Sequence, residues 1–177
     1  MTGAIPALLD LCSSTVTDVL EASSAALANL TSFCDPNCRR VMEYEGVPRL
    51  VDLVSMAFSE NLLDLDQNDE VQANAAEILA NVSRFNCELT VSSFNSAVIN
   101  ALNIMCASSN RLVKRHTPLV LGNIAQNETC RVEVGDRGGI EALFLVLEDE
   151  DTATQANALW ALCNLMWHPP NQALLSP

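Results

Sequence analysis

The feature that most constrains the fold of this chain is a segment that recurs four times along it. The clearest copy, T-Q-A-N-A-L-W-A-L-C-N-L, spans residues 154–165, and looser copies end near Thr31, Ser83 and Ala125. Aligned on one recurrent asparagine, the copies stand 52, 42 and 41 residues apart, at Asn29, Asn81, Asn123 and Asn164. Self-similarity at such a period is typical of helical solenoids, in which neighbouring repeats share one continuous core. The sequence therefore predicts an all-α solenoid.

A second pattern repeats with matching spacing and predicts a further helix in each unit. Its anchors are 42, 51 and 42 residues apart, at Ile5, Val47, Val98 and Ile140. Glycine precedes the pattern at Gly3, Gly46 and Gly138, where we expect a sharp bend out of a preceding short helix. That short helix is indicated by N-C-R-R-V-M-E-Y-E and N-E-T-C-R-V-E-V, with Asn37 and Asn127 as the expected N-caps. Each repeat is thus predicted to contain a short, a middle and a long third helix.

This combination of patterns resembles the armadillo repeat. G-x-[IV]-x-x-L, followed about 20 residues later by A-L-x-A-L-x-N-L, is the pattern of that family, and it covers essentially the whole chain. The resemblance implies a right-handed α-solenoid, with three helices per repeat, whose third helices line a concave groove. Residues 1–177 then form a single solenoid with three full repeats and partial ones at both ends. The expected divisions are a partial repeat, three full repeats and the start of another, at 1–35, 36–84, 85–126, 127–168 and 169–177.

The one long interval places about 10 extra residues in the repeat 36–84, within the acidic segment 55–70. We expect a loop there, and three interpretations remain open: a tolerated insertion, an extension of the middle helix, or a docking loop for a partner. The run D-L-D-Q-N-D-E lacks the glycine turn and the ligand spacing of an EF-hand, so no calcium site is predicted.

The acidic composition excludes one class of partner. The net charge is −13, from 22 acidic and 9 basic residues, and no basic stripe is present to bind nucleic-acid phosphates. An acidic field favours basic partners, although it equally fits a plainly solvated surface. Seven scattered cysteines within apolar helical patterns are typical of free thiols in a reducing compartment, so we expect a cytoplasmic location. The sequence contains no run of 18 apolar residues, so no transmembrane segment is predicted.

The sequence contains no set of residues typical of a catalytic site. The two histidines, His116 and His168, have no strand-turn-helix context for a nucleophile, and no glycine-rich phosphate loop is present. Cys34 and Cys38 are four apart, but no second pair completes a zinc set. The sequence therefore predicts a protein that is not an enzyme, with no metal and no cofactor.

The candidate binding residues lie on one face of the third helices, because residues three and four apart share a helix face. One turn before the recurrent asparagines lie Ala25, Glu77, Leu119 and Trp160, and three residues earlier come Ala22, Asn74, His116 and Asn157. By resemblance to peptide-binding armadillo proteins, the asparagines would bind a partner's main chain and the tryptophan its side chains. The candidate site is Asn29, Asn74, Glu77, Asn81, His116, Asn123, Asn157, Trp160 and Asn164. The alternative role for the asparagines is to join neighbouring repeats, since buried polar groups need partners.

The charges on this face predict a mixed groove. Glu77 would suit a lysine or arginine of a partner, whereas Lys114 and Arg115 place positive charge near the next helix. Only Trp160 retains the W-x-x-x-N pair that the importin-α resemblance would require on several repeats.

The sequence therefore predicts a non-enzymatic scaffold or adaptor that binds an extended or helical segment of a protein partner in the groove. A first alternative is an armadillo-only adaptor that tethers a secretory organelle or vacuole to motor or cytoskeletal partners. That role needs a lipidated N-terminus upstream, which alone would attach this cytoplasmic chain to a membrane. A second alternative, an importin-α-like carrier of basic peptides, is disfavoured by Ala25, Glu77 and Leu119 at tryptophan positions.

Overall fold

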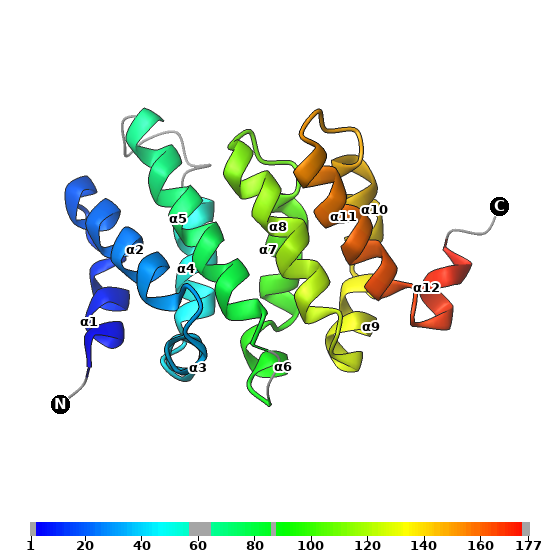
Figure 1. Cartoon of the computed structure of the whole chain (residues 1–177), viewed down its shortest axis with the longest axis horizontal. Coiled ribbons are helices and arrows are strands. Elements are labelled where there is room, and N and C mark those ends of the chain that lie inside the picture. Colours follow the sequence, from blue (N-terminus) through cyan, green and yellow to red (C-terminus); the bar gives the residue numbers. More distant parts are fainter. Residues whose placement is uncertain (1–2, 57–64, 86–87, 175–177) are drawn as a thin grey trace.

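The computed structural model is a row of helices in repeating order, with the two ends of the chain at opposite ends of the row (Figure 1). It describes residues 3–56, 65–85 and 88–174, and all the regular secondary structure of that part of the chain is helical. The long third helices lie side by side along the row, each packed against the next. They are α2 (Thr17–Thr31), α5 (Leu65–Ser83), α8 (Arg111–Ile124) and α11 (Thr152–Leu165).

The remaining helices support this row from two sides. Each middle helix packs against the third helix that follows it in the chain, and these are α1 (Ala4–Leu11), α4 (Gly46–Met56), α7 (Ser96–Met105) and α10 (Gly139–Val146). The short helices α3 (Asp35–Glu43), α6 (Thr90–Ser93) and α9 (Glu128–Asp136) lie along the lower edge of the row in Figure 1. The last short helix, α12 (Pro169–Ala173), lies at the C-terminal end of the row. The third helices, which carry the asparagines, are thus packed against a layer of middle helices.

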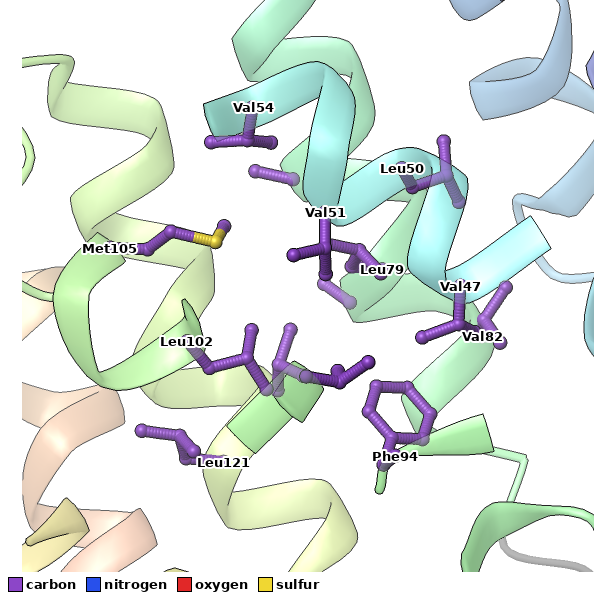
Figure 2. Packing of buried hydrophobic residues seen from close by; sticks show 14 of the residues in the cluster. Val47, Leu50, Val51, Val54, Leu79, Val82, Phe94, Leu102, Met105 and Leu121 are labelled. Carbon is purple, nitrogen blue, oxygen red and sulfur yellow. The ribbon is translucent and has the colours of Figure 1, made fainter. Parts of the chain in front are cut away.

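The core is one continuous strip that runs through successive repeats. Buried apolar side chains from Ile5 to Leu165 belong to a single cluster. Figure 2 shows its centre, where Val47 and Val82 lie close to Phe94 from the next repeat. Apolar residues three and four apart give each helix such a buried stripe, and neighbouring repeats cover one another's stripes. The sequence pattern thus accounts for why the helices stack in a row.

The N-caps of the short helices differ from one repeat to the next. Asn127 caps α9 as predicted, since its side chain accepts hydrogen bonds from the backbone N–H groups of Thr129 and Cys130. The prediction for Asn37 is wrong, because α3 already begins at Asp35. Pro36 lies in the first turn, where its fixed φ favours helix initiation, so Asn37 is inside the helix. Its amide instead donates to the Leu30 carbonyl at 2.7 Å.

The glycine turns before the middle helices use two different residues. Before α10, Gly138 itself has the left-handed backbone conformation, with φ 80°. Before α4 that conformation belongs to Glu45, with φ 53°, and not to Gly46. Gly46 is required for close approach, because a β-carbon there would lie 2.8 Å from the Val41 carbonyl oxygen. The expectation that Gly46 supplies the bend is therefore wrong.

Part of the segment 55–70, in which a loop was expected, is helical. Residues 57–64 lie outside the described part of the chain, and the interpretations of the insertion remain predictions there. Residues 65–70, however, form the first turns of α5, which has 19 residues where α8 and α11 have 14. The C-terminal part of the inserted segment therefore lengthens a third helix, and it places Asp69 and Glu70 on a helix.

Cysteine burial varies along the solenoid. Of the cysteines in the described residues, all are free thiols, and burial raises the pKa of Cys106 to about 12 and that of Cys38 to about 11. Cys163 is exposed on α11. The helices within residues 3–56, 65–85 and 88–174 include none that is both long enough and apolar enough to span a bilayer.

Candidate binding surface along the third helices

The recurrent asparagines join neighbouring third helices through hydrogen bonds. Asn81 Nδ2 donates to Thr31 Oγ1 at 3.3 Å, Asn123 Nδ2 to Ser83 Oγ at 2.9 Å, and Asn164 Nδ2 to the Gly122 carbonyl at 2.9 Å. Asn29, on the first third helix, is exposed. The amide nitrogens are thus used inside the protein, as the alternative interpretation anticipates. An amide carries two donors and an acceptor, so capacity for a partner's main chain remains where the side chain is accessible.

Accessibility separates the members of this asparagine row. Asn81 and Asn164 are half-buried, whereas Asn123 is only 4% exposed. Asn123 also donates to the Ala80 carbonyl at 3.4 Å, so its amide bridges two acceptors of the preceding repeat. Of the predicted site residues in this row, Asn123 therefore has the strongest structural role, while Asn29, Asn81 and Asn164 present atoms to the surface.

The residues seven positions before the recurrent asparagines also join neighbouring third helices through hydrogen bonds, except at one junction. Asn74 Nδ2 donates to Ser24 Oγ at 3.2 Å, and Asn157 Nδ2 donates to the Arg115 carbonyl at 2.9 Å. Between them, at the α5–α8 junction, the equivalent residue is His116, whose buried Nδ1 has no hydrogen-bond partner among the described residues. The surface is hollowed at this junction.

The hollow between α5 and α8 has a volume of about 410 Å³ and brings together several predicted site residues. Its polar lining includes three carboxylates, of Asp69, Glu70 and Glu77, none of which forms an ion pair with a described residue. An apolar wall is provided by Ala73 and Leu112. The rest of the lining is Asn74, Asn110 and His116. We call this space the α5–α8 hollow.

The α5–α8 hollow carries an excess of negative charge. Burial is the largest influence on His116 and lowers its pKa. The negative charge of Glu77 raises the pKa by less than burial lowers it, and the positive charge of Arg115 lowers it further. A neutral His116 leaves the carboxylates without a compensating charge. Lys114, expected to contribute positive charge here, is instead bound to Asp149 at 3.0 Å. Lys114 is therefore neutralised outside the hollow, whereas Arg115 is exposed on α8 without an ion pair to a described residue, and the mixed character of the groove stays a prediction.

Sequence reasoning identified Glu77, Asn74 and His116 but not all of the residues around them. Asp69 and Glu70 were assigned to a loop, and their position on α5 brings them into the hollow. Asn110 is the N-cap of α8, and its Nδ2 reaches across to the Asp69 carbonyl at 2.7 Å. The N-cap position was readable from Asn110 directly before an apolar periodic run, but the cross-helix hydrogen bond has no sequence signal.

Trp160 forms a second feature of this surface, on α11. It is 37% exposed, and its ring lies against Gly122 of α8 so closely that a β-carbon on Gly122 would overlap it. The same Gly122 carbonyl accepts the hydrogen bond of Asn164, so Trp160 and Asn164 contact α8 within one turn. Sequence reasoning missed Gly122, although a glycine inside a helical pattern is a recognised sign of close packing.

Comparison with known proteins supports this architecture. A family model described as the armadillo/beta-catenin-like repeat matches residues 2–32 and 127–167. An engineered protein solved by the Northeast Structural Genomics Consortium is 28% identical, with a TM-score of 0.79, over 92% of this chain and 38% of its own. Another from that consortium is 25% identical, with a TM-score of 0.78, over 91% of this chain and 62% of its own. This chain therefore spans less than two thirds of either protein.

Proteins designed as armadillo repeats show the same fold at lower sequence identity to this chain. A designed armadillo repeat protein in complex with the peptide (KR)4 is 18% identical, with a TM-score of 0.75, over 92% of this chain and 64% of its own. Another, computationally designed for modular peptide recognition, has 21% identity and a TM-score of 0.77. At these identities the likeness concerns the fold. The resemblance drawn from the sequence and the all-α solenoid are both confirmed.

Proposed function

We propose that this chain, an armadillo-repeat solenoid, is a non-enzymatic scaffold that holds a segment of a partner protein against its third helices. The observation that carries the proposal is the α5–α8 hollow, where three carboxylates have no cationic partner among the described residues. Armadillo-repeat proteins are generally binding scaffolds, and the third-helix face is the surface on which this chain gathers unpaired polar groups.

A lysine or arginine side chain fits the α5–α8 hollow with both its methylene stem and its charged head. The methylene stem would lie along Ala73 and Leu112, and the charged head would reach the carboxylates. Glu77 is half-buried, which strengthens a charge-assisted hydrogen bond because water screens it less. An arginine could also engage a carboxylate through two parallel N–H donors.

The remaining site residues would hold the rest of the segment. Asn81 and Asn164 retain hydrogen-bonding capacity for a main chain, and the exposed part of the Trp160 ring offers an apolar surface for a side chain. The designed armadillo protein solved with (KR)4 supports a basic partner for this fold. The departures from W-x-x-x-N elsewhere argue for an adaptor with one basic anchor and against a carrier that reads a long basic signal. A cytoplasmic location belongs to this proposal.

The proposal is tested by the binding of a fluorescently labelled (KR)4 peptide to the whole chain, followed by anisotropy. Glu77→Gln should weaken binding about tenfold, since it removes a charge-assisted hydrogen bond of about 1.5 kcal/mol or more. Glu141→Gln is the matched control, because it removes the same charge from an exposed position on α10. Affinity should also fall with added salt.

Two results would contradict the proposal. Equal losses for Glu77→Gln and Glu141→Gln would mean that the peptide senses only the overall acidic field. Failure of the wild-type chain to bind (KR)4 at low salt would remove the basic side chain from the proposal.

A further inference from the structure

The turn that follows α2 holds an aromatic residue in a conformation that its type disfavours. Residues 31–34 form a type II β-turn, in which Ser32 has φ −61° and ψ 116° and Phe33 has φ 55°. The Cys34 N–H donates to the Thr31 carbonyl at 3.3 Å and closes this turn. The third position of a type II turn needs a positive φ and is ordinarily glycine or asparagine. A bulky residue with positive φ is a conformational outlier.

Phe33 gains no burial to offset this unfavourable conformation. Its side chain is 88% exposed, the highest value among the exposed large apolar residues of the described chain. Leu30, one turn earlier at the end of α2, is 36% exposed. An unfavourable backbone that is kept without a packing benefit points to a role in recognition.

A cation lies directly over this aromatic ring. Arg84 is the first residue after α5, and its guanidinium carbon is 5.2 Å from the centre of the Phe33 ring. One of its nitrogens is 3.5 Å from Asn81 Oδ1, and no described carboxylate forms an ion pair with it. A cation after a helix C-terminus is favoured by the helix dipole, but the dipole does not account for the exposed ring beneath it.

The pair has the chemistry of a carboxylate site with an apolar rim. A guanidinium carries five N–H donors, and Arg84 directs one of them to Asn81 Oδ1, so donors remain for a carboxylate, which an arginine can bind through two parallel hydrogen bonds. Arg84, like Arg40, Arg115 and Arg131, forms no ion pair with a described carboxylate, but among the described arginines it is the one that lies over an aromatic ring.

We propose that Leu30, Phe33 and Arg84 form a docking surface for an acidic, apolar segment of a partner protein. The surface is distinct from the α5–α8 hollow, because Arg84 follows the end of α5 while Asp69 lies near its start, about 20 Å away along the helix. Charge complementarity selects the occupant, a segment in which aspartate or glutamate alternates with leucine-like residues. A second copy would bring a whole net charge of −13 against this chain and is disfavoured by repulsion, whereas a short acidic segment brings only a few carboxylates, next to Arg84.

The test uses the labelled peptide Leu-Asp-Leu-Glu-Leu and its uncharged counterpart Leu-Asn-Leu-Gln-Leu. The acidic peptide should bind the wild-type chain at least about tenfold more tightly than its counterpart, because a charge-assisted pair is lost in the latter. Arg84→Gln and Phe33→Gly should each abolish that preference. Phe33→Gly should leave the melting temperature unchanged or raise it, since glycine accepts the left-handed backbone.

Two controls separate recognition from backbone and charge effects. Glu45→Gly relieves the same kind of left-handed conformation, at φ 53°, away from the surface. Arg115→Gln removes an exposed arginine from α8. Both should bind the acidic peptide as the wild type does. Equal affinity for the two peptides, or retained preference in Phe33→Gly or in the alternative variant Phe33→Asn, would overturn the proposal. Self-association of the chain that Arg84→Gln abolishes would also overturn it, in favour of a second copy.

Discussion

Gly122 provides the sharpest test of how α8 and α11 pack. It lies inside α8, where alanine ordinarily stabilises a helix by about 1 kcal/mol relative to glycine. A β-carbon at this position would overlap Cε3 and Cζ3 of Trp160 and would lie 3.1 Å from the Ala161 Cα atom. Relief requires movement of the indole ring or of α11, and overpacking of this kind costs about 1–3 kcal/mol. We therefore expect Gly122→Ala to destabilise the chain by up to about 2 kcal/mol.

The sign of the effect should reverse when the ring is removed. In a Trp160→Ala background the overlap with the indole is gone, and Gly122→Ala should stabilise the chain by up to about 1 kcal/mol. The measurement is urea unfolding of the four chains of this double-mutant cycle, followed by circular dichroism at the helical minimum. A coupling energy of about 1–3 kcal/mol is expected, equivalent to a few degrees in melting temperature. If Gly122→Ala has the same effect in both backgrounds, the ring does not pack on α8 as described.

Two further predictions concern the other rows of the surface. Asn123→Ala should lower the free energy of unfolding by about 1–3 kcal/mol, because it removes the buried amide that bonds to Ser83 and Ala80. Asn29→Ala should change it by less than about 0.5 kcal/mol, because Asn29 is exposed, and equal losses in the two variants would contradict the assigned roles. Burial lowers the pKa of His116 below its ordinary 6.5, so the unfolded chain takes up this proton first and stability should decline as the pH falls below that value. His116→Asn should reduce that decline between about pH 7.5 and 5.5 in urea titrations, and an unchanged decline would assign it to other groups.

Much of the fold was predictable because a repeated sequence places each residue next to its equivalents. The spacing of Asn29, Asn81, Asn123 and Asn164 was enough to predict a row of third helices, since a stacked repeat must present the same position on the same face. The structure places all of them on α2, α5, α8 and α11 as expected. Periodicity does not show which neighbour an amide contacts, so both roles of the asparagines remained open until the packing was known.

The residues that form the turns and helix starts were harder to predict, because any of several neighbouring residues can adopt the required backbone conformation. Gly46 was expected to supply the bend before α4, but the left-handed residue is Glu45, and Gly46 provides space for the Val41 carbonyl. Asn37 was expected to cap α3, but Pro36 starts that helix earlier. Phe33 gave no sequence signal at all, since nothing in its neighbours shows that a type II turn places it in the left-handed region.

Several residues of the candidate site could be predicted from the sequence, but the hollow that they line could not. Glu77 and His116 share a face with the asparagines by helix geometry, and that much follows from spacing. The α5–α8 hollow additionally requires that α5 extend back to Leu65, so that Asp69 and Glu70 join the lining. It also depends on His116, which replaces the asparagine bond found at the neighbouring junctions. These are tertiary consequences of one inserted segment and one substitution, which a single sequence cannot reveal.

The direction of the asparagine hydrogen bonds bears on how the chain assembles as it is made. In each bond the donor belongs to the later helix and the acceptor to the earlier one, 40 to 50 residues upstream. A ribosome delivers the chain from its N-terminus, so every acceptor emerges before the asparagine that will use it. Each new third helix can therefore pack on the repeat made before it, and growth of the solenoid does not require the last repeat.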